Sequence, residues 1–167
     1  MQQVFELLIL ATRLQDFRNG DSYIVKPAKN SLETILVVED DPIVLGAVGA
    51  ILEGAGFCVL TATNSTEAIK KENGYYDTIH LLISDVMMPD MSGPVISKLL
   101  KKHRPEMRVM LMSGYPEGDM LFLNDGWNFI QKPFVPQALI AKVNELLHSA
   151  QPTPCDQRLC NSAGVRN

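Results

Sequence analysis

Three groups of charged residues in this chain each follow a short apolar run, and their types could support chemistry on phosphate. They are Glu39, Asp40 and Asp41 after residues 35–38, Asp85 after residues 80–84, and Lys132 after the run around residues 129–130. Carboxylate oxygens are the preferred ligands of hard divalent cations, and a lysine can neutralise a phosphoryl group. If the three runs are neighbouring strands of a parallel sheet, their carboxyl ends meet at one edge. The sequence then predicts a crevice that could hold a divalent cation and a phosphoryl group.

Clustered carboxylates at such an edge would need positive charge nearby. Two carboxylates about 4 Å apart repel by roughly 4 kcal/mol at an effective dielectric constant near 20, which is a large share of a domain's typical stability of about 5–15 kcal/mol. Lys132 would offset part of this repulsion, and a cation with oxygen ligands would offset the rest. Mg2+ fits best, because it is usually bound by one or two carboxylates together with water and phosphate. A carboxylate such as Asp85 can also be the nucleophile in phosphoryl transfer.

From about Thr34 onward, short apolar runs alternate with segments of helical periodicity, which predicts repeated strand–helix units. The predicted strands cover residues 35–38, 58–62, 81–84, 109–112 and the region of 129–130. The predicted helices cover 42–55, 64–71, 95–103, a weak segment at 119–124, and 139–147. The run 35–38 is apolar on both faces, as in a central strand. The expected fold class is α/β, with a five-stranded parallel sheet.

Local patterns mark where these helices begin and end. Asp41 can cap the helix that Pro42 opens, and Asn64 with Glu67 three residues later has the spacing of a capping box. Pro105 prevents the helix at 95–103 from continuing. A single acid at a strand end would therefore be interpreted as a cap. Several acids, a hydroxyl and a lysine at strand ends favour a site instead.

The composition narrows the function classes. The chain has 167 residues, of which 46% are hydrophobic and 20% charged, which suits one domain rather than two. Its net charge of -4 gives no reason to expect direct nucleic-acid binding. The apolar stretch at residues 7–11 is too short to span a membrane. Three cysteines, at positions 58, 155 and 160, are too few for a secreted disulfide framework and lack zinc-site spacing, so we expect a cytoplasmic protein.

We expect one domain at residues 31–150 between two extensions. Residues 1–30 place several apolar side chains on one helical face, namely Val4, Leu7, Leu8, Ala11 and Leu14. Such a helix could pack on the domain, pair two chains as a homodimer or dock a partner, and a poorly ordered leader is an equal alternative. Residues 151–167 are rich in Pro, Asn, Ser and Gln and have no periodicity, which predicts a disordered tail.

Residues 34 to about 149 resemble the receiver domain of two-component response regulators. The resemblance rests on four separated motifs in the expected order: Glu39-Asp40-Asp41-Pro42, Asp85-Val86-Met87-Met88-Pro89, Met112-Ser113-Gly114 and Lys132-Pro133-Phe134. It implies the doubly wound, flavodoxin-like (βα)5 receiver fold with strand order 2-1-3-4-5. It also implies that Glu39 and Asp40 bind Mg2+, that Asp85 is the phosphoacceptor, and that the backbone carbonyl of Met87 completes the protein's share of the metal ligands.

The resemblance implies further roles and partners. Ser113 matches the family's hydroxyl position, Lys132 its lysine before a proline, and Phe129 its aromatic switch position. The phosphodonor would be a histidine kinase. We hypothesise that an unknown partner protein reads the signal through the fourth helix, fifth strand and fifth helix, including Phe122, Trp127 and Phe129, because the linkage from Ser113 and Lys132 to that face is short. The chain would be a stand-alone receiver, or a receiver detached from a larger kinase, with no output domain. Its chemistry would be limited to its own phosphorylation and slow loss of the phosphate.

Other interpretations use the same residues. A phosphatase of the haloacid dehalogenase type needs Asp, one residue and Asp after its first strand, whereas the first position here is Glu39. A structural interaction module without phosphorylation is disfavoured because the acidic, hydroxyl and lysine positions are all retained. Flavodoxin-like cofactor binding is disfavoured because no Ser/Thr/Gly-rich phosphate loop follows the first strand. Met87 and Phe129 could be plain packing residues, and His80 and His103 are interpreted as structural or exposed.

Overall fold

Strands and helices alternate from residue 34 to residue 113 as the hydrophobic pattern predicts. The computed structural model describes residues 32–114 and 127–148. The elements in chain order are β1 (Thr34–Val38), α2 (Pro42–Gly54), β2 (Cys58–Ala62), α3 (Ser65–Gly74), β3 (Leu81–Asp85), α4 (Gly93–His103), β4 (Arg108–Ser113), β5 (Asn128–Gln131) and α5 (Pro136–His148). The five predicted strands are all present. The weak helix predicted at 119–124 lies outside the described residues.

The five strands form one sheet in the order β2-β1-β3-β4-β5, and every adjacent pair is parallel. The predicted doubly wound sheet with strand order 2-1-3-4-5 is thus confirmed. All residues of β1 are buried, since β1 lies between β2 and β3 and is covered on both faces. The direction of winding reverses between β1 and β3. In open sheets of this kind, ligands bind beyond the carboxyl ends of the strands at such a reversal.

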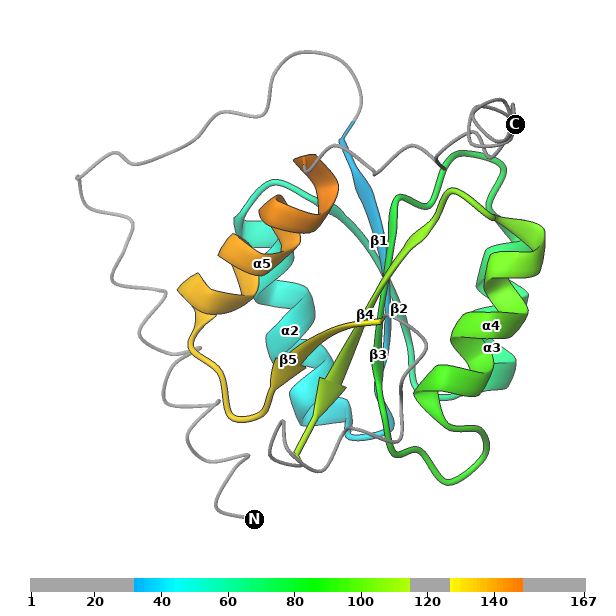
Figure 1. Ribbon diagram of the computed structural model, residues 1–167, viewed down its shortest axis with the longest axis horizontal. Helices are drawn as coiled ribbons and strands as arrows, with labels where there is room; N and C mark the ends of the chain where they lie inside the picture. The colour runs from blue at the N-terminus through cyan, green and yellow to red at the C-terminus, as the bar shows by residue number, and fades with distance from the viewer. Residues whose placement is uncertain (1–31, 115–126, 149–167) are drawn as a thin grey trace, which may run out of the picture.

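Helices cover both faces of the sheet, and each face has its own hydrophobic core. In Figure 1, α2 and α5 lie on one side of the strands, and α3 and α4 lie on the other. Side chains alternate between the two faces along each strand. The α2/α5 core includes Ile35, Val37, Val48, Leu52, Leu81, Ile83, Met110 and Leu139, and the α3/α4 core includes Leu36, Val38, Leu82, Ile96, Leu100, Val109 and Leu111. Burial of each such side chain contributes about 1.5–3 kcal/mol, so the two cores hold the strands in register.

Helix α2 begins at the predicted residue and ends at Gly54, one residue before the predicted end. The Asp41 side chain accepts hydrogen bonds from the backbone N–H groups of Ile43, at 2.8 Å, and Val44, at 3.3 Å. Asp41 therefore caps the helix that Pro42 opens. Just beyond the other end, Gly56 has a φ of 93°, a left-handed conformation that glycine adopts at little cost.

Helix α3 begins at its predicted cap but is longer than predicted. The Asn64 side chain accepts a hydrogen bond from the N–H of Glu67 at 2.8 Å, as in a capping box. The reciprocal bond differs from that motif, because the Glu67 carboxylate accepts from the N–H and the hydroxyl of Thr63, at 2.8 and 2.9 Å. The helix continues to Gly74, whereas the prediction ended it at residue 71.

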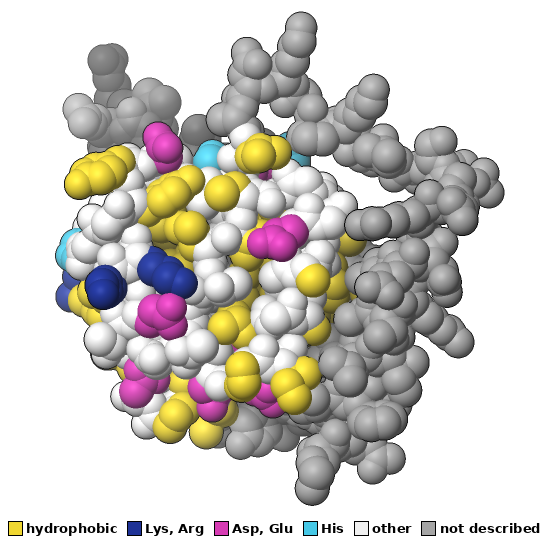
Figure 2. Space-filling view, turned by 180° about the vertical axis from the view of Figure 1, so that it is seen from behind, with side chains coloured by type: hydrophobic (Ala, Val, Ile, Leu, Met, Phe, Trp, Pro, Cys, Tyr) yellow, Lys and Arg dark blue, Asp and Glu magenta, His cyan; other side chains and the backbone are white. Residues whose placement is uncertain are grey.

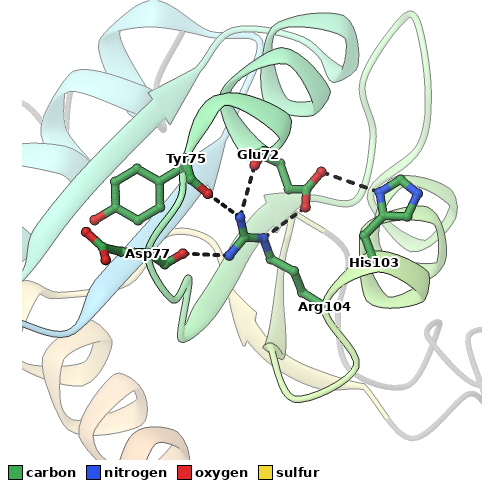
Figure 3. Close-up of polar contacts among 5 residues, drawn as sticks. All are labelled: Glu72, Tyr75, Asp77, His103 and Arg104. Atoms are coloured by element: carbon green, nitrogen blue, oxygen red, sulfur yellow. Dashed lines mark hydrogen bonds and ion pairs between the residues drawn. The ribbon is translucent and has the colours of Figure 1, made fainter.

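A buried ion pair explains the extra turn of α3 (Figure 3). The Glu72 side chain is only 5% exposed, and its Oε1 lies 2.9 Å from Nε of Arg104, just after α4. The other guanidinium nitrogens donate to backbone carbonyl oxygens, Nη1 to Asp77 at 2.7 Å and Nη2 to Glu72 at 3.1 Å and Tyr75 at 2.5 Å. Nδ1 of His103 lies 3.4 Å from the second oxygen of Glu72. Because all its nitrogens are engaged, Arg104 ties α3, the loop after it and the end of α4 together.

His80 joins the starts of two central strands, in keeping with the structural role predicted for it. Its Nδ1 accepts a hydrogen bond from the N–H of Thr34 at 3.0 Å. Its own backbone N–H donates to the Thr34 carbonyl oxygen at 2.8 Å. The imidazole ring of His80 therefore serves as a hydrogen-bond acceptor for the backbone of β1.

The surface of the described residues mixes polar and apolar side chains. On the face shown in Figure 2, hydrophobic side chains form small groups between acidic and basic ones. The exposed large hydrophobic residues within the described ranges are Leu32, Ile43, Tyr76, Met87, Val95 and Val135. In residues 32–114 and 127–148, no helix has both the length and the apolar character needed to cross a bilayer. The predictions for residues 1–30 and 151–167 and for Phe122 fall outside the described residues.

Candidate functional site

Side-chain alternation in three strands continues beyond the hydrophobic core and ends in charged residues. The residues of β1, β3 and β5 that face α2 and α5 are Ile35 and Val37, Leu81 and Ile83, and Ile130. Glu39, Asp85 and Lys132 come next in the same two-residue period. The two-residue period that places apolar side chains in the α2/α5 core therefore also places two acids and a lysine at the edge of the sheet where the strands have their carboxyl ends.

The register of the sheet brings these strand ends side by side. Val38, the last residue of β1, pairs with Ser84, the next-to-last residue of β3. Asp85 pairs with Met112, next to the last residue of β4. The last residues of β4 and β5 also pair with each other. The residues predicted to form a site, which end or follow these strands, therefore lie along one edge of the sheet.

Three acids at this edge form a cluster that could hold a metal ion. Glu39, Asp40 and Asp85 each offer a carboxylate oxygen, and these oxygens lie within 4.8 Å of one another. Glu39 is buried, Asp85 is half-buried and Asp40 is exposed, so the cluster is open to solvent on one side. Hard oxygen ligands with an open side for water suit Mg2+. The structure thus brings together the three acids that the sequence predicted to meet.

Lys132 supplies positive charge inside this cluster. Its Nζ lies 2.6 Å from Oε2 of Glu39 and 3.3 Å from Oδ2 of Asp85, and 11% of its side chain is exposed. Its backbone N–H donates to the Ser113 carbonyl oxygen at 2.7 Å, which anchors the chain just after β5. The peptide bond between Lys132 and Pro133 is cis. The ammonium group therefore bridges two carboxylates that would otherwise repel each other.

Burial raises the pKa of Glu39. The residue is 2% exposed, and its desolvation raises the pKa of the carboxyl from 4.5 to about 7. The Lys132 ammonium opposes this shift because it favours the carboxylate, whereas the charges of Asp85 and Asp40 add to it. Glu39 can therefore carry a proton near neutral pH. A divalent cation that binds the cluster would displace this proton, because metal ligands must be deprotonated.

Asp41, the third of three consecutive acids, serves the fold. Its Oδ1 accepts two backbone N–H groups at the start of α2. A side chain in this position satisfies donors that the helix itself cannot pair. The sequence allowed acids at strand ends to be either caps or site residues. The structure separates the two roles, since Glu39 and Asp40 belong to the cluster and Asp41 is the cap.

Ser113 and Phe129 share the face of the sheet that α3 and α4 cover. Phe129 pairs with Leu111, whose side chain belongs to the α3/α4 core, and Ser113 follows Leu111 by two residues. Ser113 is 1% exposed, whereas Phe129 is half-buried and packs against the same core. The aromatic ring therefore does have a packing role. The switch role predicted for the two residues stays a prediction.

Met87, whose backbone carbonyl is predicted to bind the metal, lies between two buried neighbours. Val86 is 7% exposed and Met88 is 9% exposed, whereas Met87 is 60% exposed. The N–H of Val86 donates to the Met112 carbonyl oxygen at 2.9 Å, which extends the pairing of β3 with β4 by one residue. The backbone of Met87 thus leaves the sheet next to Asp85, and its role as a ligand stays a prediction.

Gly93, which the sequence analysis did not single out, touches the backbone of Asp85. A Cβ atom on Gly93 would lie 2.2 Å from the Asp85 carbonyl oxygen. The N–H of Gly93 also donates to the Val86 carbonyl oxygen at 3.1 Å. The first turn of α4 can approach Asp85 this closely only because residue 93 has no side chain. Its place between Ser92 and Pro94, two residues before the predicted helix at 95–103, was the pattern that could have indicated this contact.

A second unpredicted contact joins the loop after Asp85 to helix α3. Oδ2 of Asp90 accepts hydrogen bonds from the N–H of Ser65, at 2.7 Å, and from its hydroxyl, at 2.5 Å. The hydrogen bond from the hydroxyl lowers the pKa of Asp90, so this side chain is a carboxylate at neutral pH. No local sequence pattern pairs two residues that are 25 positions apart.

Comparisons with known proteins agree with this geometry. The family model of the response regulator receiver domain matches residues 35–144. The chain is 33% identical over 118 residues to the sensor kinase CckA of Brucella abortus and 34% identical over 118 residues to the transcriptional regulatory protein CssR of Bacillus subtilis. Each match covers 68% of this chain, but only 12% of the kinase and 51% of the regulator. A crystal structure of a response regulator receiver domain protein from Clostridium thermocellum is 32% identical with a TM-score of 0.63, over 70% of this chain and 94% of that chain.

Proposed function

Because this chain belongs to the response regulator receiver family, we propose that it is a phosphoacceptor switch in a two-component phosphorelay. One observation carries the proposal: the half-buried Asp85 carboxylate lies 3.3 Å from the Lys132 ammonium, and one of its oxygens is within 4.8 Å of oxygens from Glu39 and Asp40. This arrangement can neutralise the charge of a phosphoryl group and offers a carboxylate as nucleophile.

Asp85 is the proposed nucleophile. One of its carboxylate oxygens attacks the phosphorus of a phosphohistidine on a histidine kinase. A P–O bond forms while the P–N bond breaks, and the electron pair of the broken bond returns to the imidazole nitrogen. The products are an acyl phosphate on Asp85 and a free histidine on the donor. Alignment and charge neutralisation provide most of the catalysis in such a transfer, so few groups are needed.

Mg2+ is the cofactor proposed for this site. Glu39, Asp40 and Asp85 would provide carboxylate oxygens, and Met87 would provide its backbone carbonyl oxygen. When bound, the ion neutralises charge on the phosphoryl oxygens. Lys132 adds a second positive charge on the side of Asp85. The donor set of hard oxygens supports this choice over softer metals, which prefer sulfur or imidazole.

Ser113 and Phe129 are proposed to convert phosphorylation into a change at the surface. An acyl phosphate adds nearly two negative charges and several acceptor oxygens, one of which the Ser113 hydroxyl can bind. A shift of this hydroxyl toward the phosphate would vacate space on the face of the sheet that Phe129 shares. The half-buried ring can then move inward. The location of both residues on one face supports this coupling.

A partner protein is proposed to read this change at β5, α5 and the segment between β4 and β5. Trp127, just before β5, and Phe129, within it, are both half-buried against the α3/α4 core. Hydrogen-exchange mass spectrometry with Mg2+, with and without beryllium fluoride as a phosphoryl mimic, tests this surface. Exchange should change mainly in β5 and α5. Uniform changes over the domain, or no change in these elements, would remove the proposed surface.

The phosphoacceptor assignment is tested by intact-mass measurement after incubation with Mg2+ and acetyl phosphate. The parent chain should gain the mass of one phosphoryl group and lose it slowly after the donor is removed. Asp85→Asn should gain nothing. Asp41→Asn is the matched control, because asparagine caps helices as well as aspartate does and the three clustered acids remain. A mass gain that survives Asp85→Asn would put the acceptor elsewhere, and rapid turnover of an aryl phosphate would favour a phosphatase.

A further inference from the structure

The loop after β3 must hold the Met87 backbone in place although the Met87 side chain contributes little packing. That side chain is 60% exposed. On the near side, the N–H of Val86 is bonded to the Met112 carbonyl oxygen at 2.9 Å, and the Val86 side chain is buried. On the far side, Met88 is buried, and the loop then runs through Pro89 to Asp90 before α4 begins.

Asp90 fastens the far side of this loop to another helix. Its Oδ2 accepts both the N–H, at 2.7 Å, and the hydroxyl, at 2.5 Å, of Ser65, the first residue of α3. Ser65 is 4% exposed, whereas Asp90 itself is exposed, so the pair lies at the edge of the packed part of the domain. The first N–H groups of a helix have no partners within the helix, and they favour a negative charge. The contact is therefore a charge-assisted pair of hydrogen bonds.

The same helix start is tied to the other ligand-bearing loop. Ser65 begins α3 three residues after Ala62, the last residue of β2. The Ala62 carbonyl oxygen accepts the backbone N–H of Glu39 at 3.1 Å. Through Ser65, Asp90 thus connects the loop that carries Met87 with the strand end that carries Glu39. Both ends of this connection are residues of the proposed metal site.

We propose that Asp90 and Ser65 are positioning residues that set the Mg2+ affinity of the phosphoacceptor site. This inference rests on the proposed function and deepens it. The pair touches neither the metal nor the phosphoryl group. It holds the backbone between Asp85 and α4, so that the carbonyl oxygen of Met87 is already in place when the ion arrives. Groups that hydrogen-bond directly to metal ligands typically change the affinity by about 10–100-fold. Asp90 and Ser65 act on the ligands only through the backbone, so we expect an effect at the lower end of that range.

A plain helix cap is the competing explanation, and α3 provides its own control. Asn64 already caps this helix through a hydrogen bond from the N–H of Glu67 at 2.8 Å. Asn64→Ala should weaken the start of α3 without touching the loop after β3. If Asp90 and Ser65 acted only as a second cap, their variants would behave like Asn64→Ala.

The experiment compares the full chain with Asp90→Ala, Asp90→Asn, Ser65→Ala and Asn64→Ala. For each protein, the Mg2+ concentration for half-maximal phosphorylation by acetyl phosphate, the rate at saturating Mg2+ and the melting temperature are measured. Asp90→Ala should raise the half-saturating Mg2+ concentration about tenfold while the rate at saturation stays close to that of the parent. Ser65→Ala should have a smaller effect, because its backbone N–H can still bond, and Asp90→Asn should recover part of the loss because it keeps an acceptor oxygen.

Asn64→Ala should lower the melting temperature and leave the half-saturating Mg2+ concentration unchanged. Equal half-saturation in Asp90→Ala and the parent would overturn the positioning role. So would an equal rise in Asp90→Ala and Asn64→Ala. Calorimetric titration with Mg2+ alone provides the same comparison without phosphorylation. If the parent binds Mg2+ but is never phosphorylated at Asp85, the proposed function fails while the calorimetry still decides the role of the pair.

Discussion

Replacing Gly93 with alanine should damage both the fold and the site, because the new methyl group would meet backbone. Its Cβ would lie 2.2 Å from the Asp85 carbonyl oxygen and 3.1 Å from the Ser84 hydroxyl, whereas ordinary van der Waals contacts lie at 3.4–4 Å. The carbonyl cannot turn away as a flexible side chain could, since Asp85 is paired with Met112 in the sheet. The start of α4 and the end of β3 would have to separate by about 1 Å.

The expected cost is about 2–3 kcal/mol. An extra methyl group in a well-packed region typically costs about 1–3 kcal/mol, and a backbone neighbour at this distance favours the upper end. Alanine has a better helix propensity than glycine by about 1 kcal/mol, but this gain is reduced at the first residue of a helix. A loss of this size is a large share of the roughly 5–15 kcal/mol that holds a typical domain together.

Gly46→Ala provides the matched control, because it makes the same chemical change without a clash. Gly46 is exposed in the middle of α2, and a Cβ there would meet no atom within 4 Å. This variant should gain about 1 kcal/mol from helix propensity. Urea denaturation gives the free energy of unfolding of the parent and both variants. Phosphorylation by acetyl phosphate with Mg2+, followed by intact mass, should slow in Gly93→Ala and remain unchanged in Gly46→Ala.

Two results would refute this reasoning in different ways. Equal free energies of unfolding for Gly93→Ala and the parent would mean that α4 can move aside without cost, so the close approach to Asp85 would not constrain the fold. If Gly93→Ala is destabilised but is phosphorylated at the parent's rate, the close contact matters only for packing and does not affect the position of Asp85.

Three further predictions concern the charged groups. Burial raises the pKa of Glu39 from 4.5 to about 7. Without Mg2+, the free energy of unfolding measured by urea denaturation should therefore fall by about 3 kcal/mol as the pH rises from 4.5 to 7. The Glu39→Gln variant should not show this fall. Arg104→Ala would leave the buried Glu72 carboxylate without its guanidinium and should cost about 3–5 kcal/mol in thermal unfolding. Lys132→Gln should bind Mg2+ more tightly in calorimetry, because Glu39 loses its ion pair, yet be phosphorylated about 100-fold more slowly at saturating Mg2+.

Each of these predictions has a control and a contradicting outcome. The free energy of unfolding falls with rising pH because the Glu39 carboxyl loses its proton near pH 4.5 in the unfolded chain but keeps it to about pH 7 in the folded chain. As a control, saturating Mg2+ should abolish this fall. An equal fall in Glu39→Gln would assign it to other groups. Lys142→Ala, which removes an exposed ion pair with Glu145, should cost less than about 1 kcal/mol, and an equal cost in Arg104→Ala would contradict the importance of burial. Unchanged phosphorylation in Lys132→Gln would mean that the lysine takes no part in phosphoryl transfer.

The sequence alone was enough to predict the sheet and most of the site, because both depend on local patterns. The apolar runs and helical stripes predicted the five strands. The family resemblance predicted their order in the sheet. Acids and a lysine directly after those runs had to meet at one edge once the strands were parallel, and Glu39, Asp85 and Lys132 do so. Helix caps such as Asp41 were predictable for the same reason, since a cap and its donors are neighbours in the chain.

Tertiary structure alone decided the contacts between residues far apart in the chain. The pairing of Asp90 with Ser65, the ion pair of Glu72 with Arg104 and the closeness of Gly93 to Asp85 depend on how helices pack on the sheet, which leaves no periodic trace in the sequence. The raised pKa of Glu39 is of the same kind, because desolvation depends on everything that surrounds the carboxyl group. Local patterns thus determined which residues arrive at the sheet edge, and packing determined how firmly they are held there and in which protonation state.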